Sequence, residues 1–143
     1  MKLNFQGWGG LVNIFIVEDD LSLLGLYQKV FENTDHQISD IASNGQEAVE
    51  KYIKLSKKPD LIIMDHRMPI KNGLETTKEI LHLDNHVKII FASADKSINE
   101  KALSIGASSF LEKPFTISDL INEIERVIQV PRSILHHSNK ESI

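Results

Sequence analysis

Residues 60–65, which read DLIIMD, decide the fold of this chain. Four consecutive apolar residues predict a strand over residues 61–64 that is buried on both faces. Such strands are typical of parallel sheets, because crossover helices cover both faces of a parallel sheet. Pro59 ends the preceding helical pattern, and the polar residues after Met64 begin a loop. We therefore expect helices and strands to alternate on either side of this stretch.

The rest of the chain shows that alternation. We predict strands at residues 13–17, 37–42, 61–64, 87–91 and 108–111, and helices at residues 21–31, 46–55, 73–83, 97–105 and 117–130. Asn44 and Thr116 are expected N-caps, and Gly106 is an expected helix stop. Right-handed crossovers leave few topologies for such a chain. The fold class is α/β, with a doubly wound five-stranded parallel sheet.

Helical spacing also predicts which side chains face the core. In the first helix Leu21, Leu24, Tyr27, Gln28 and Phe31 share one face. In later helices the expected inward residues are Ala48, Val49, Tyr52 and Ile53, then Leu74, Thr77, Ile80 and Leu81.

Composition limits the possible functions. The 143 residues, of 16.2 kDa, suit one domain, which we place at residues 11–130 between a flexible lead (1–10) and a polar tail (131–143). The absence of cysteine excludes disulfides and thiol catalysis and suits a cytoplasmic location. A net charge of -4 argues against direct nucleic-acid binding, and no apolar run is long enough to cross a membrane.

Polar residues follow the predicted strands at one edge of the sheet. Glu18, Asp19 and Asp20 follow the first strand, Asp65 the third, Ser93 the fourth and Lys113 the fifth. Ligands of open parallel sheets bind outside the carboxyl ends of the strands, so these side chains are expected to converge. Clustered carboxylates repel one another unless a cation lies between them, and Mg²⁺ prefers oxygen ligands. Asp20 fits a helix N-cap equally well.

The chemistry of this group suggests phosphoryl transfer. A carboxylate oxygen of Asp65 beside a metal ion is able to attack phosphorus and form an aspartyl phosphate. The metal and Lys113 would offset charge on the transferring group, and the Ser93 hydroxyl would hydrogen-bond to one of its oxygens.

At these residues the chain resembles the receiver domain of two-component response regulators, of the single-domain, chemotaxis-regulator-like type. The matching motifs are the acidic pair Glu18-Asp19, the stretch ending at Asp65 with Met68-Pro69 and Gly73 after it, Ser93-Ala94 and Lys113-Pro114. Each motif is weak alone, but all occur in order and at matching spacing over about residues 11–130.

The resemblance implies a flavodoxin-like fold with strand order 2-1-3-4-5. It implies that Asp65 accepts a phosphoryl group from a sensor histidine kinase or phosphotransfer protein. Glu18, Asp19, Asp65 and the backbone carbonyl of Arg67 would bind Mg²⁺, while Ser93 and Lys113 would contact the phosphoryl group. Phe110 matches the switch aromatic, and an aromatic packed in the core is its alternative interpretation. The Lys113-Pro114 peptide is expected to be cis.

Two positions near the site carry charges of opposite sign. Arg67 lies two residues after Asp65, and Asp95 lies two residues after Ser93. In receivers these positions flank the path of the water that hydrolyses the phosphoaspartate. We hypothesise that Arg67 and Asp95 approach each other across the mouth of the site and slow that water; two independent surface charges are the alternative.

We therefore interpret the chain as a phosphorylation switch and not as an enzyme beyond its own phosphorylation and autodephosphorylation. Only 13 of the 143 residues follow Val130, so we expect output through protein contact at the face of residues 97–105, 108–111 and 117–130, with a homodimer possible there. Three alternatives stay open. The first is that the chain is a piece of a longer regulator or hybrid kinase. The second is an aspartyl-nucleophile phosphohydrolase, and the third is a receiver that binds a partner protein without being phosphorylated. Arg67 argues against the phosphohydrolase, because such enzymes need an acid at that position.

Overall fold

The computed structural model describes residues 12–129, so the expected lead (1–10) and tail (131–143) lie outside the described residues. Strands and helices alternate through this range. The strands are β1 (Asn13–Val17), β2 (Gln37–Ala42), β3 (Leu61–Asp65), β4 (Lys88–Ser93) and β5 (Ser109–Glu112). The helices are α1 (Leu21–Glu32), α2 (Gly45–Lys54), α3 (Gly73–Leu83), α4 (Asn99–Ser104) and α5 (Ile117–Gln129), with a 3-10 turn, η1 (Lys96–Ile98), before α4.

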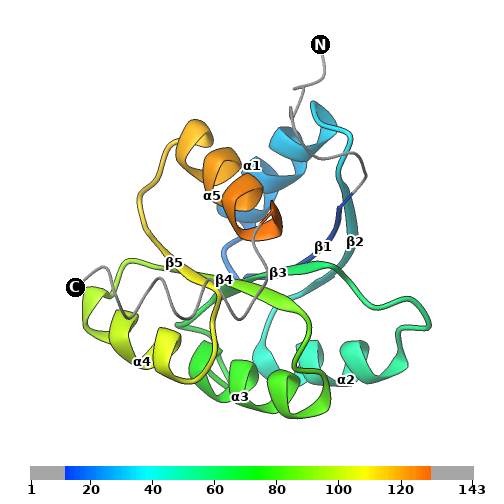
Figure 1. The fold of residues 1–143 in the computed structure, drawn as a ribbon, viewed down its shortest axis with the longest axis vertical. Helices are drawn as coiled ribbons and strands as arrows, with labels where there is room; N and C mark the ends of the chain where they lie inside the picture. Colours follow the sequence, from blue (N-terminus) through cyan, green and yellow to red (C-terminus); the bar gives the residue numbers. More distant parts are fainter. Residues whose placement is uncertain (1–11, 130–143) are drawn as a thin grey trace.

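The five strands form one parallel sheet in the order β2-β1-β3-β4-β5, which confirms the predicted fold. Helices α1 and α5 cover one face of the sheet, and α2, α3 and α4 cover the other (Figure 1). The strand order reverses between β1 and β3, which are neighbours in the sheet. Ligand sites of doubly wound folds lie at the carboxyl ends of the strands beside this switch point.

Strand β3 explains why both layers are stable. Leu61 and Ile63 pack beneath α1 and α5, while Ile62 and Met64 pack beneath α2, α3 and α4. All four side chains are almost completely buried. Strand side chains alternate between the two faces, so one apolar run contributes to both cores.

Local signals fix where the helices begin. Asn44 accepts a hydrogen bond from the backbone N–H of Glu47 at 2.8 Å, and Asn72 forms a capping box with Glu75 at the start of α3. Thr116 and Asp119 exchange two hydrogen bonds of 3.0 Å before α5. Gly106 has φ 116°, the left-handed conformation expected of a residue just after a helix.

Several sequence predictions need correction. Leu21 is 81% exposed and Ile53 is 59% exposed, although helical spacing placed both on core faces. Both residues lie at helix ends, Leu21 as the first residue of α1 and Ile53 in the last turn of α2. The helix predicted at residues 97–105 begins as the 3-10 turn η1, and α4 spans only Asn99–Ser104. Strands β4 and β5 each begin and end one or two residues later than predicted.

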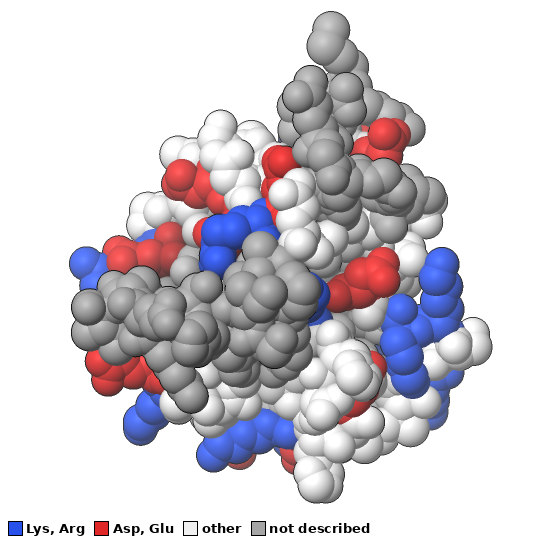
Figure 2. All heavy atoms as spheres, viewed as in Figure 1, with Lys and Arg blue, Asp and Glu red and all other residues white. Residues whose placement is uncertain are grey.

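Within residues 12–129, no helix has both the length and the apolar character required to span a bilayer. Acidic and basic side chains are interspersed on the described part of the face in Figure 2.

Candidate functional site

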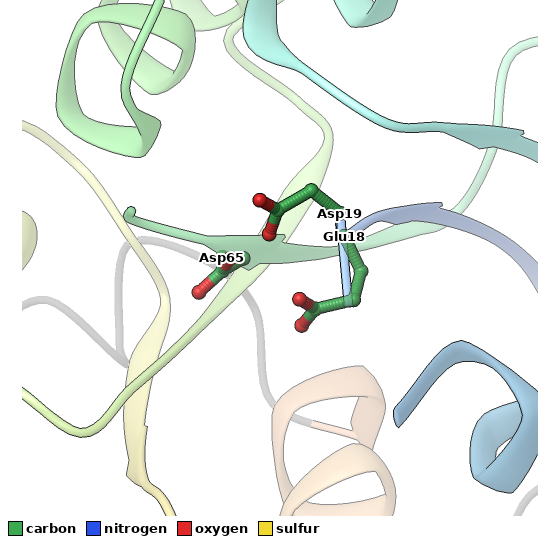
Figure 3. Close-up of side chains that lie close together, drawn as sticks. All are labelled: Glu18, Asp19 and Asp65. Carbon is green, nitrogen blue, oxygen red and sulfur yellow. The ribbon is translucent and has the colours of Figure 1, made fainter. Parts of the chain in front are cut away.

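Three carboxylates meet at the carboxyl end of the sheet. Glu18 and Asp19 directly follow β1, and Asp65 is the last residue of β3. One oxygen from each carboxylate lies within 4.8 Å of the other two. Figure 3 shows the three side chains turned toward a shared space between the two strand ends. Because β1 and β3 are adjacent parallel strands, their ends deliver these acids to one place.

Glu18 is the most deeply buried of the three acids, with 3% of its surface exposed. Its Oε2 accepts a hydrogen bond from the backbone N–H of Asp20 at 3.1 Å. Burial raises the pKa of Glu18 to about 7, and nearby Asp65 adds to the rise, while the hydrogen bond from Lys113 opposes it. Burial and Asp65 also raise the pKa of Asp19, although that side chain is exposed. The cluster therefore disfavours negative charge on its own acids, as expected of a site for a cation.

Lys113 supplies the positive charge in this structure. Its Nζ lies 2.9 Å from Oε1 of Glu18 and 3.1 Å from Oδ1 of Asp65. Burial alone would lower the pKa of Lys113, but the contacts with Glu18 and Asp65 raise it overall. The peptide between Lys113 and Pro114 is cis, as the resemblance implied. The backbone N–H of Lys113 donates to the carbonyl oxygen of Ser93 at 2.9 Å, which ties the ends of β4 and β5 together.

Ser93 lies in the same cleft, which has a volume of about 550 Å³ and also contains the three acids and Lys113. The Ser93 side chain is buried, and its hydroxyl oxygen accepts a hydrogen bond from the backbone N–H of Asp95 at 3.1 Å. The hydroxyl proton is thus left to donate toward a group in the cleft. The polar side chains that were expected to converge at this edge of the sheet do line one cleft.

Arg67 and Asp95 do approach each other at the cleft. The guanidinium Nη2 of Arg67 lies 3.7 Å from Oδ2 of Asp95, and both residues line the cleft. The Arg67 side chain is 82% exposed and the Asp95 side chain 26%, so the ion pair is weak. Asp95 has a second contact, because its Oδ1 accepts a hydrogen bond from the backbone N–H of Ser97 at 3.0 Å.

Phe110 is half-buried on β5, where its ring stacks on that of Phe91 with 6.2 Å between centroids. His66, the residue after Asp65, turns inward and is half-buried. Its ring packs against Phe91 with 5.8 Å between centroids, and its Nδ1 is buried. Phe91 thus contacts both the residue after Asp65 and the aromatic residue of β5.

Sequence reasoning missed some residues at the cleft. Lys96 and Ser97 of η1 line it, and their short distance along the chain from Ser93-Ala94 was available as a signal. Asp20 also lines the cleft, but its Oδ1 accepts hydrogen bonds from the N–H groups of Ser22 and Leu23. Asp20 is therefore the N-cap of α1, one of its two predicted interpretations.

Comparison with known proteins assigns the family. The model of the response regulator receiver domain matches residues 14–125. The chain belongs to this family. The chemotaxis protein CheY of Thermotoga maritima is 34% identical over 116 residues, which cover 80% of this chain and 95% of the relative.

Solved structures of receiver domains share the fold. A CheX–CheY complex with BeF₃ and Mg²⁺ from Borrelia burgdorferi aligns with a TM-score of 0.77 at 26% identity, covering 81% of this chain and 88% of that chain. The receiver domain of a sensor histidine kinase from Pseudomonas aeruginosa PAO1 aligns with a TM-score of 0.75 at 25% identity, covering 85% of this chain and all of that one. Magnesium is coordinated in the active-site cleft of that second domain. This chain is thus a receiver domain like those of the CheY proteins.

The acid cluster fits a divalent cation by its donor chemistry. Glu18, Asp19 and Asp65 offer three hard oxygen ligands within 4.8 Å of one another, and hard oxygen atoms are the ligands that Mg²⁺ prefers. Arg67, whose backbone carbonyl was the predicted fourth ligand, lines the same cleft.

Proposed function

We propose that this receiver domain accepts a phosphoryl group on Asp65 in a Mg²⁺-dependent reaction and so switches a protein-interaction surface. The supporting observation is the arrangement of Lys113. Its ammonium contacts both Glu18 and Asp65, beside a third carboxylate. Once Asp65 carries a phosphoryl group, the ammonium of Lys113 would be close enough to pair with one of the phosphoryl oxygens.

The proposed step moves a phosphoryl group from a phosphohistidine of a sensor kinase or phosphotransfer protein. A carboxylate oxygen of Asp65 forms a bond to phosphorus while the bond between phosphorus and the histidine nitrogen breaks, and its electron pair returns to the imidazole. Lys113 would pair with one oxygen of the transferred group, and the Ser93 hydroxyl would donate to another. Mg²⁺ held by Glu18, Asp19, Asp65 and the carbonyl of Arg67 would neutralise charge on the phosphoryl oxygens. A sensor kinase makes phosphohistidine from ATP, which is available in the cytoplasm. We therefore place the protein in the cytoplasm.

We place the output surface on α4, β5 and α5. Ser93 ends β4, Phe110 lies on β5, and Lys113 directly follows β5. Inward movement of Ser93 and Lys113 would open space for the half-buried ring of Phe110. A downstream protein would bind this surface in its phosphorylated conformation, and any homodimer would form through the same surface. Sedimentation velocity with and without phosphorylation tests the homodimer.

Intact-mass spectrometry tests the proposed chemistry. Incubation with acetyl phosphate and Mg²⁺ is expected to add one phosphate to the wild-type protein, and none to Asp65→Asn. Asp60→Asn is the matched control, because Asp60 lies before the opposite end of β3 and accepts from the N–H of Asn13 at 2.8 Å, which asparagine also does. Equal phosphate addition to wild type and Asp65→Asn would remove Asp65 as the acceptor.

Two simple assays address the alternatives. Sustained Mg²⁺-dependent turnover of p-nitrophenyl phosphate would favour a phosphohydrolase. A receiver is expected to show no sustained turnover of this ester and to carry at most one phosphoryl group per chain. Partner binding that is unchanged in Asp65→Asn would favour a receiver that acts without phosphorylation.

We also propose that the pair formed by Arg67 and Asp95 lengthens the life of the phosphorylated state by obstructing the attacking water. The 3.7 Å approach at the cleft supports this role. Arg67→Ala and Asp95→Ala are each expected to speed loss of phosphate several-fold, because each change removes a side chain that would obstruct the attacking water. The effect is steric, because an exposed pair contributes only about 0–1 kcal/mol to stability. Unchanged phosphate lifetimes in both variants would contradict the role.

A further inference from the structure

Ile70 has an unusual backbone conformation. It is the one non-glycine residue with positive φ among residues 12–129, with φ 72°. The backbone N–H of Lys71 donates to the carbonyl oxygen of Pro69 at 2.8 Å, so Ile70 is the central residue of a γ-turn. Side chains branched at Cβ are strongly disfavoured in this region, where glycine or asparagine is usual. The fold therefore loses stability by holding isoleucine in this turn.

The Ile70 side chain restores almost none of that stability, because 79% of its surface is exposed. An isoleucine in a strained and exposed position contributes little to folding. Strained residues of this kind concentrate at functional sites, where the surrounding structure fixes them.

The loop that carries Ile70 is held firmly at several points. At its base, the N–H of Gly73 donates to the carbonyl of His66 at 2.9 Å. On one side, the carbonyl of Lys71 accepts from the N–H of Gly45 at the start of α2 at 3.2 Å, and the ammonium of Lys71 pairs with Glu79 of α3 at 2.6 Å. Ile70 is thus an exposed apolar side chain on a loop that these contacts hold in place.

This loop also borders the proposed reaction centre. It begins directly after Asp65, and Arg67 from the same loop lines the acid cleft. Any protein that brings a phosphohistidine to Asp65 must cover the mouth of that cleft. A small acyl phosphate, in contrast, can enter the cleft without touching a side chain five residues further along the chain.

We infer that Ile70 is a specificity-determining contact for the protein phosphodonor. The donor protein would carry an apolar patch beside its phosphohistidine, and the Ile70 side chain would pack against that patch. This inference rests on the proposed function of Asp65. A fixed apolar side chain lowers the entropic cost of docking, because little of the loop needs to be ordered when the partner binds.

The test compares two phosphodonors. The first is acetyl phosphate, and the second is the phosphorylated histidine kinase or phosphotransfer protein of the same genome that transfers fastest to the wild-type chain. Ile70→Asn removes the apolar side chain while tolerating positive φ, and Ile70→Leu keeps an apolar side chain. Leu83→Asn is the control, because Leu83 is 52% exposed at the far end of α3, which begins beside the site and runs away from it.

With the protein donor, kcat/KM of Ile70→Asn is expected to fall about tenfold, the size of losing one buried apolar contact. Ile70→Leu should keep most of the wild-type value, and Leu83→Asn should match wild type. With acetyl phosphate all the variants should match wild type, and thermal unfolding should show Ile70→Asn to be at least as stable as wild type.

Two results would overturn the inference. Wild-type transfer from the protein donor to Ile70→Asn would show that the side chain makes no useful contact. An equal loss with both donors would show that Ile70 shapes the loop instead. Failure of acetyl phosphate to label the wild-type protein would instead refute the acceptor role of Asp65, so the two failures are distinguishable.

Discussion

At the residue scale, the acid cluster is unbalanced in charge. Three carboxylates face one ammonium, that of Lys113, which contacts Glu18 and Asp65. Asp19 lies outside these two contacts, and burial together with Asp65 raises its pKa. Like charges held this close destabilise the fold whenever no cation is bound. The acid cluster therefore favours the binding of a cation but lowers the folding stability of the protein without one.

Asp19→Asn is expected to increase the free energy of unfolding in the absence of Mg²⁺, because it removes one of the repelling charges. The gain should be small, on the order of a few tenths of a kcal/mol, since the Asp19 side chain is exposed and solvent screens its charge. The same change should weaken the thermal stabilisation that added Mg²⁺ gives. Thermal unfolding with and without Mg²⁺ measures both effects.

Asp20→Asn is the matched control for that change, because asparagine caps a helix about as well as aspartate and Asp20 lies outside the cluster. It should show little change in either measurement. A loss of stability in Asp19→Asn without Mg²⁺ would contradict the repulsion argument.

Single residues also show the limit of sequence reasoning. The acids, Ser93 and Lys113 were predictable, because each directly ends or follows an apolar strand. The inward turn of His66 was not predictable, because it depends on Phe91 from another strand. The left-handed conformation of Ile70 was not predictable either, since local preference opposes it and only tertiary contacts explain it.

At the element scale, the loop after β3 is positioned by close contact between backbones. Gly73 begins α3, and a Cβ at this position would lie 2.1 Å from the carbonyl oxygen of Asp65 and 2.9 Å from Cα of His66. Those neighbours are backbone atoms and cannot move aside without moving the phosphoacceptor. The absence of a side chain at Gly73 thus sets the path of the chain around Asp65.

Gly73→Ala is expected to destabilise the protein by more than about 1 kcal/mol and to slow phosphorylation by acetyl phosphate. Gly25→Ala is the control. Gly25 lies inside α1, where a Cβ would meet no other atom within 4 Å, so alanine should stabilise the helix by up to about 1 kcal/mol. Chemical denaturation and intact-mass kinetics measure the two effects. Normal stability and kinetics in Gly73→Ala would show that the loop relaxes more easily than its contacts indicate.

A second link joins α2 to the end of α3. The hydroxyl of Tyr52 donates to Oδ2 of Asp84 at 2.6 Å, and this hydrogen bond is the main cause that lowers the pKa of Asp84. A carboxyl whose pKa is lower in the folded state stabilises the fold above its unfolded pKa, near 3.8. That contribution is lost as the pH falls through the lower, folded pKa.

Tyr52→Phe should therefore lower the free energy of unfolding by about 1–2 kcal/mol at pH 7. Its difference from wild type should shrink as the pH drops below about 4. Urea denaturation over a pH series tests this. Asp84→Asn keeps an acceptor but not the charge, so it should lack this part of the pH dependence. A difference that stays constant down to about pH 2.5 would contradict the assignment.

At the scale of the whole molecule, the topology was predictable because β3 and its neighbours carry continuous apolar runs that only a doubly covered sheet buries. The region before β5 was less predictable. Short elements such as η1 and α4, of three and six residues, carry little periodic signal. Exposed apolar residues such as Leu21 were also assigned wrongly, because periodicity cannot reveal where a layer ends. Of these poorly predicted parts, α4 belongs to the surface proposed to switch and η1 directly precedes it.

The proposed switch predicts which elements change their dynamics when Asp65 is phosphorylated. Beryllium fluoride with Mg²⁺ is expected to change amide hydrogen exchange in η1, α4 and β5, because Ser93 and Lys113 connect the site to these elements. The amides of β1 and β3 in the sheet centre should change little. Ser93→Ala keeps Asp65 and the acid cluster, so it should still take up phosphate from acetyl phosphate. Its exchange response in α4 and β5 should be much smaller, because the hydroxyl that links the phosphoryl group to β4 is missing. A full response in Ser93→Ala would mean that Lys113 alone moves the surface, through its backbone contact with β4.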